Sequence, residues 1–122
     1  MSDGPLLLVV DDDPSVLLLV DVLAEKMGFR VKAVSNGLQA LEHLRDGLQP
    51  SVILLDIMME RIDGLTFLNH LREMPGLEST PVVAMSTAAV LDRYGDQLRV
   101  SGTLLKPITQ ATLAQALEGY SK

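Results

Sequence analysis

The 122-residue sequence contains no cysteine and no tryptophan, and aromatic residues make up only 3% of it. Without cysteine the chain can form neither a disulfide nor a thiolate metal site, which is compatible with a reducing compartment. The longest apolar runs, Leu6–Val10 and Val16–Val20, are far too short to span a bilayer. No basic segment of the kind that opens a signal peptide precedes them. We therefore expect a cytoplasmic protein with an aliphatic core and no contact with a membrane.

Basic residues are also few, since 10 Lys and Arg stand against 16 Asp and Glu, for a net charge of −6. A protein that binds nucleic acid directly needs a basic face, so this balance argues against such binding by this chain. Two thirds of the net charge lies at four positions, Asp11, Asp12, Asp13 and Asp56. Carboxylates repel one another, so their concentration at these positions suggests a site.

Short apolar runs alternate with helical patterns along the whole chain. The runs predict strands at Leu6–Val10, Phe29–Val34, Val52–Leu55, Val82–Met85 and Thr103–Leu105. Helical spacing of apolar residues predicts a helix after each strand.

Smaller signals mark where these helices begin and end. Asp13 before a proline is typical of an N-cap, and Asp63 is interpreted as the start of the third helix. Asn36-Gly37 is predicted to be a turn. The fourth helical segment contains Gly95, which predicts a short helix.

This β–α alternation predicts right-handed crossovers and a parallel sheet with helices on both faces, an α/β fold. In such sheets ligands bind beyond the carboxyl ends of the strands. Polar residues stand at these ends of four of the five predicted strands: Asp11 and Asp12, Asp56, Ser86 and Thr87, and Lys106. We expect these side chains to meet at one edge of the sheet.

Three carboxylates about 4 Å apart would repel by about 4 kcal/mol for each pair at an effective dielectric constant near 20. Either they keep protons or they bind a cation, and oxygen ligands without cysteine or histidine suggest Mg²⁺. A lysine and a hydroxyl on the same rim can bind an oxyanion, a combination that suits phosphoryl transfer. One of the carboxylates can itself be the nucleophile and form an aspartyl phosphate.

At this point the sequence closely resembles the receiver domains of two-component response regulators. The resemblance rests on "VVDDDP", "ILLDIMMERIDG", "PVVAMST" and "LLKPI", in this order and spacing, and it covers residues 1 to 122 as one domain. It implies a flavodoxin-like (βα)5 three-layer sandwich whose five-stranded parallel sheet has the order 2-1-3-4-5. The domain could be free-standing or cut from a longer regulator.

The resemblance also implies roles for single residues. Asp56 would be the phosphoacceptor, Ser86 the switch hydroxyl, and Lys106 the lysine that contacts the phosphoryl group, with a cis bond to Pro107. A histidine kinase or a histidine phosphotransfer protein would supply the phosphoryl group. The positions that flank the site would be Met58, Thr87, Ala88 and Thr103. The Mg²⁺ ligands would be Asp11, Asp12, Asp56 and the backbone carbonyl of Met58.

The sequence departs from the family pattern mainly where the signal would leave the domain. Thr103 stands where an aromatic switch residue is usual, and Glu60 where proline is usual. Output would pass through the segment after Ser86, through a homodimer formed by the last strand and helices, or to a separate output domain. No turnover of a separate substrate is expected beyond autocatalytic phosphorylation and slow self-dephosphorylation.

Two other functions remain open on the sequence alone. A pseudo-receiver would use the same fold as an interaction surface without being phosphorylated. A haloacid-dehalogenase-type phosphatase would use an Asp-x-Asp pair within residues 11–13. It would also need a later acidic motif, and the only acid after Lys106 is Glu118. That reading leaves Asp56 without a role.

Overall fold

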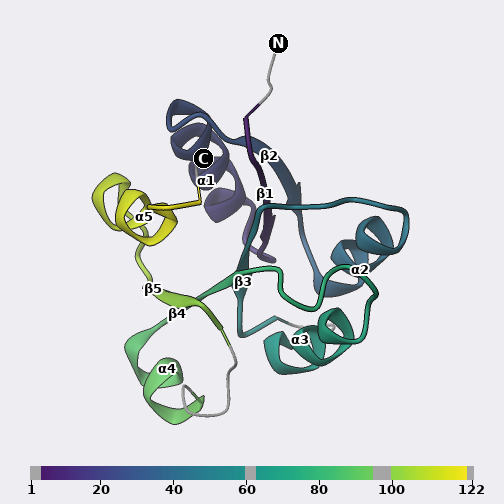
Figure 1. The fold of residues 1–122 in the computed structure, drawn as a ribbon. Helices are drawn as coiled ribbons and strands as arrows, with labels where there is room; N and C mark the ends of the chain where they lie inside the picture. Colours follow the sequence, from purple (N-terminus) through teal and green to yellow (C-terminus); the bar gives the residue numbers. More distant parts are fainter. Residues whose placement is uncertain (1–3, 60–62, 95–99, 121–122) are drawn as a thin grey trace.

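The computed structural model describes residues 4–59, 63–94 and 100–120 of the chain, and within them five strands alternate with five helices (Figure 1). Glu60, which replaces the usual proline, and Gly95, which was predicted to shorten the fourth helix, lie outside these residues. The strands are β1 (Leu6–Val10), β2 (Arg30–Val34), β3 (Val52–Asp56), β4 (Val82–Ser86) and β5 (Gly102–Leu105). The helices are α1 (Pro14–Lys26), α2 (Gly37–Arg45), α3 (Gly64–Arg72), α4 (Ala88–Tyr94) and α5 (Gln110–Leu117).

All five strands lie parallel in one sheet with the order β2-β1-β3-β4-β5. Helices α1 and α5 cover one face of the sheet, while α2, α3 and α4 lie on the other (Figure 1). The predicted flavodoxin-like sandwich is therefore confirmed. None of the helices in the described ranges is long and apolar enough to cross a bilayer.

The three central strands are buried on both faces because helices cover both. Every residue of β3 and β4 is buried, and in β1 only Leu6 is partly exposed. Full burial of one aliphatic side chain stabilises the fold by about 1.5–3 kcal/mol. The carboxyl ends of these strands are consequently held in place by apolar packing on either side.

The helix starts follow the predicted signals, with one correction. Asp13 and Asp63 are N-caps, and their side chains accept hydrogen bonds from the Ser15 and Thr66 backbone N–H groups at 2.9 and 2.8 Å. The predicted turn at Asn36-Gly37 is wrong, because Asn36 caps α2 and Gly37 is its first residue. Asparagine is as good an N-cap as a turn former, so the dipeptide alone could not separate the two.

The edge around β5 is less covered than the centre of the sheet. Thr103 is exposed, and the side chain of Leu105 is 52% exposed. The neighbouring α4 is described from Ala88 to Tyr94, and the predicted interruption at Gly95 lies outside the described residues. Thr103 and Leu105 flank Leu104 in the strand, so their side chains point to the opposite face of the sheet from that of Leu104. Leu104 itself packs into the core on the side of α5.

Candidate functional site

The polar residues predicted at the strand ends do meet at one edge of the sheet. Val10 and Leu55 are partners in the register of β1 and β3, so the residues that follow them, Asp11 and Asp56, leave the sheet side by side. Ser86 ends β4 on the other side of Asp56. The edge is shared because parallel strands all end in the same direction.

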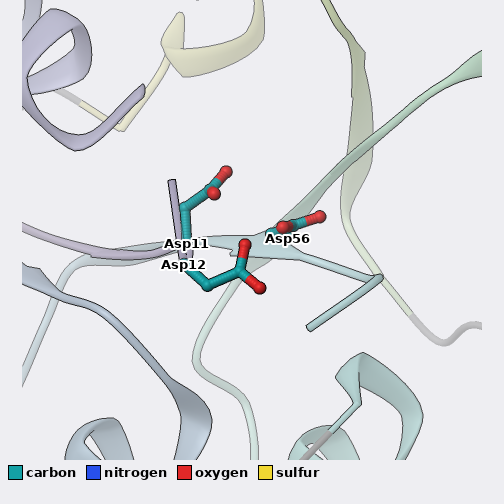
Figure 2. Close-up of side chains that lie close together, drawn as sticks. All are labelled: Asp11, Asp12 and Asp56. Carbon is teal, nitrogen blue, oxygen red and sulfur yellow. The ribbon is translucent and has the colours of Figure 1, made fainter. Parts of the chain in front are cut away.

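Three carboxylates form the centre of the site. One carboxylate oxygen from each of Asp11, Asp12 and Asp56 lies within 4.8 Å of the others. Figure 2 shows the three side chains leaving the ends of β1 and β3 into one small region. Asp11 is completely buried and Asp56 is 4% exposed, whereas Asp12 is exposed. The site is therefore open to solvent on the side of Asp12.

Lys106 reaches this group from the end of β5. Its Nζ lies 2.8 Å from Asp11 Oδ2 and 3.5 Å from Asp56 Oδ2. The Lys106 backbone N–H donates to the Ser86 carbonyl at 3.0 Å, and the bond to Pro107 is cis, as predicted. One cation thus contacts both buried carboxylates.

Backbone groups complete part of the carboxylate coordination. The Asp13 N–H donates to Asp11 Oδ1 at 2.9 Å, and the Met58 N–H donates to Asp56 Oδ1 at 3.2 Å. Asp11 Oδ2 is buried and accepts no hydrogen bond from the part of the chain that the structure describes. Its contact in that part of the chain is the ion pair with Lys106. An under-coordinated buried oxygen beside two further carboxylates fits a hard divalent cation such as Mg²⁺.

The electrostatics of the group follow from burial. The pKa of Asp56 is raised to about 6, first by burial and then by the charge of Asp11, while Lys106 opposes the change. Partial burial works against the charge of Lys106, but its contacts with Asp11 and Asp56 prevail and raise the pKa of the ammonium above its usual value. The carboxylate of Asp56 therefore holds a proton more readily than that of an ordinary aspartate.

Residues 7–118 match the family described as response regulator receiver domain. This protein belongs to that family. The receiver domain is 36% identical over 110 residues to Response regulator Rre1 of Synechocystis sp., which covers 88% of this chain and 47% of Rre1. It is 29% identical to Protein PilG of Pseudomonas aeruginosa, over 98% of this chain and 89% of PilG.

Solved structures agree in fold. The receiver domain of sensor histidine kinase PA1611 from Pseudomonas aeruginosa, with a magnesium ion coordinated in its active site cleft, has a TM-score of 0.86 to this chain. The two are 24% identical, and the match covers 96% of this chain and 97% of the other. The present chain matches about half the length of Rre1 and 26% of Transcriptional regulatory protein ZraR of Klebsiella oxytoca.

Three of the four predicted flanking residues of the receiver domain lie at the rim of the site. Met58 is 56% exposed, and Thr87 and Ala88 are exposed directly after β4. Thr103 is exposed on β5, where it pairs with Ala84 in the body of the sheet, short of the edge that carries the carboxylates. Its position therefore places it behind the site.

The loop after β3 returns to the strand through Gly64. The Gly64 N–H donates to the Ile57 carbonyl at 3.0 Å, and a Cβ on this glycine would lie 2.9 Å from the Ile57 Cα. Only glycine permits this approach, because the Ile57 Cα belongs to the backbone and cannot rotate away as a side chain can. The start of α3 is thereby packed directly against the residue that follows Asp56.

A groove beside the site was not predicted. It has a volume of about 640 Å³ and lies between the start of α1 and the segment after β5. The lining residues are Asp13, Ser15, Val16, Leu19, Thr87, Lys106, Pro107 and Ile108. The run "VLLLV" held the only signal, because five consecutive apolar residues on a helix cannot all face the core.

Proposed function

We propose that Asp56 is the phosphoacceptor of this receiver domain. The observation that carries the proposal is the convergence of Asp11, Asp12 and Lys106 on this one carboxylate. Asp56 is the last residue of a fully buried strand, which fixes its position. Neutral pH lies above the Asp56 pKa of about 6, so the carboxyl group is mainly ionised, as a nucleophile must be.

Each neighbour has a role in accepting the phosphoryl group. A carboxylate oxygen of Asp56 attacks the phosphorus of a phosphohistidine, the phosphorus–nitrogen bond breaks, and the imidazole leaves with its electron pair. Lys106, which contacts Asp56, would neutralise a phosphoryl oxygen, and Ser86 would supply a hydroxyl at the end of β4. Mg²⁺, held by Asp11, Asp12, Asp56 and the Met58 carbonyl, would offset the negative charge of the group.

The proposed donor is a histidine kinase or a histidine phosphotransfer protein. Leu18, Leu19 and Val22 on α1 are 66%, 39% and 47% exposed, and Leu19 also lines the groove beside Lys106. An exposed apolar patch with a polar rim is typical of protein interaction sites. This surface would hold a donor protein with its phosphohistidine near Lys106. An output domain or a homodimer through β5 and its neighbours remains part of the proposal.

The alternatives differ in their chemistry. For a haloacid-dehalogenase-type phosphatase, Glu118 would have to join the site, but it is the C-cap of α5, at the opposite end of that helix from Lys106. A pseudo-receiver would keep the fold and leave Asp56 unphosphorylated. The same labelling experiment separates the pseudo-receiver from the proposed function.

Incubation with acetyl phosphate and Mg²⁺ should add one phosphoryl group to the protein, measured by intact mass. Asp56→Asn should abolish the addition, because the amide is not a nucleophile of this kind. Asp13→Asn is the matched control, since asparagine preserves the N-cap of α1 and labelling should persist. Full labelling of the Asp56→Asn protein would refute the assignment, and an unlabelled wild type would favour the pseudo-receiver.

A further inference from the structure

Methionine is the main oxidisable side chain of this protein, because the sequence has six methionines but neither cysteine nor tryptophan. Five of the six lie in the described part of the chain. Met59 and Met85 are buried at 8% and 0% exposure, and Met27 and Met74 are partly buried against the two cores. Met58 stands apart with 56% of its side chain exposed.

The exposed methionine is also next to the reacting group. The Met58 backbone N–H donates to Asp56 Oδ1 at 3.2 Å, so Met58 is in direct contact with the phosphoacceptor. Asp56 itself is 4% exposed and is enclosed by β1, β4 and Lys106. Exposed neighbours of Asp56 are Asp12, in the carboxylate cluster, and Met58, two residues along the chain. Water therefore reaches the acceptor past exposed residues, of which Asp12 is one and Met58 another.

We propose that Met58 is an oxidation site at which peroxide shortens the lifetime of the phosphoryl group on Asp56. The inference rests on the proposed function of Asp56. The thioether sulfur attacks one oxygen of hydrogen peroxide, a sulfur–oxygen bond forms, and the oxygen–oxygen bond breaks. The second oxygen leaves as water, so the side chain is oxidised by two electrons and the peroxide is reduced.

The effect on the acyl phosphate follows from polarity. Hydrolysis requires a water that attacks the phosphorus, breaks its bond to Asp56 and gives up a proton. A thioether covers this approach as a weak acceptor and cannot orient the water. A sulfoxide oxygen is a strong acceptor on the same flexible stem, and it can align the water. Oxidation thus replaces an apolar side chain beside the acyl phosphate with a polar one that can hydrogen-bond the attacking water.

The other methionines give a different signature. Met59 and Met85 belong to the cores, so oxidation there introduces a polar group among aliphatic side chains and lowers the melting temperature. Oxidation of Met58 adds the same polar oxygen at the surface and leaves the melting temperature unchanged. Melting curves therefore report whether an observed effect arises at the rim or in the core.

The experiment treats the protein with millimolar hydrogen peroxide for a short time and locates the sulfoxide by peptide mass mapping. Met58 should be oxidised at least tenfold faster than Met59 and Met85, because these two are buried. Oxidised and untreated samples are then phosphorylated with acetyl phosphate and Mg²⁺ and freed of donor. The oxidised sample should lose its phosphoryl group about two- to tenfold faster, below the range for full general acid–base help.

Two variants act as controls, each compared with itself before and after peroxide. Met58→Leu removes the sulfur at similar volume and should abolish the response of the decay rate to peroxide. Met27→Leu, at the far end of α1, should keep the response. Methionine sulfoxide reductase should reverse it in the wild type.

Each outcome decides the inference. An untreated protein that takes up no phosphoryl group overturns both the inference and the proposed function of Asp56. A labelled protein whose decay is unchanged, or slowed, after Met58 is oxidised overturns the inference alone. A response that persists in Met58→Leu, or that comes with a lower melting temperature, also overturns it.

Discussion

The two halves of the active edge are held by very different amounts of packing. β1 and β3 have a strand on either side and helices on both faces, and they carry Asp11 and Asp56. β5 is an edge strand with Thr103 and Leu105 exposed. The acceptor and its buried partner thus sit on the rigid half. Lys106 reaches them from the half with the exposed edge strand, so its ion pairs with Asp11 and Asp56 join the two halves.

The largest expected difference between the halves is in stability. Leu55→Ala, in the fully buried β3, should lower the free energy of unfolding by about 2–5 kcal/mol because it leaves a cavity. Leu105→Ala, half-exposed on β5, should change it by about 0.5 kcal/mol or less. Urea denaturation measures both. Equal losses would contradict the contrast between a packed and an uncovered half.

The second effect is the pH dependence that the charge of the rigid half creates. Asp56 has a pKa of about 6 in the folded protein against 3.8 for an ordinary aspartate, so between these values the folded state holds a proton that the unfolded chain has lost. Metal-free stability should therefore fall as pH rises from about 4 to 7, by about 2–3 kcal/mol from this group at most. Asp56→Asn should remove this part of the dependence.

Mg²⁺ sharpens the same test because it binds the ionised carboxylates. The rise in melting temperature with millimolar Mg²⁺ should be clear at pH 7.5 and small at pH 5, where protons compete for Asp56. Asp12→Asn should weaken it, whereas Asp92→Asn, exposed on α4 in the other half, should not. Identical melting with Mg²⁺ and with EDTA would show that no such cation site forms.

The smallest effect concerns the link between the halves. Lys106→Met should lower metal-free stability by about 1–2 kcal/mol, because Asp11 Oδ2 loses its ion-pair partner. It should also raise the pKa of Asp56 further, since Lys106 opposes that rise. Lys26→Met, on the exposed end of α1, should change stability by about 0.5 kcal/mol or less. Carboxylate NMR shifts and urea melts give the two readings, and an unchanged Asp56 titration would contradict the coupling.

The sequence predicts the five strands and their shared edge well because each rests on a simple signal, whereas the strand order is implied by the resemblance to a known family. Short apolar runs bounded by polar or turn residues predict buried strands, and parallel strands must present Asp11, Asp56, Ser86 and Lys106 on the same side. The predicted bounds differ by one residue or less for all five strands, as at β2, which begins at Arg30. The resemblance to a known family supplies the roles, which remain proposals for the single residues.

Other features depend on three-dimensional detail that no periodicity carries. Asp11 and Asp12 are neighbours in sequence, yet one is buried and the other exposed, since the direction of the chain beyond β1 decides this. Lys106 lies nearer to Asp11 than to Asp56, which follows from the path after β5. The capping box of α5 was missed because Thr112, the partner of Thr109, is not the usual glutamate or glutamine.

Gly64 extends the constraint of the active edge to a position with no chemistry of its own. Any side chain there would press on the Ile57 backbone, and Ile57 directly follows Asp56. In a library of random variants, this codon should therefore be depleted of every substitution under selection for signalling. The accurate placement of Asp56 thus depends partly on a buried glycine that has no functional group.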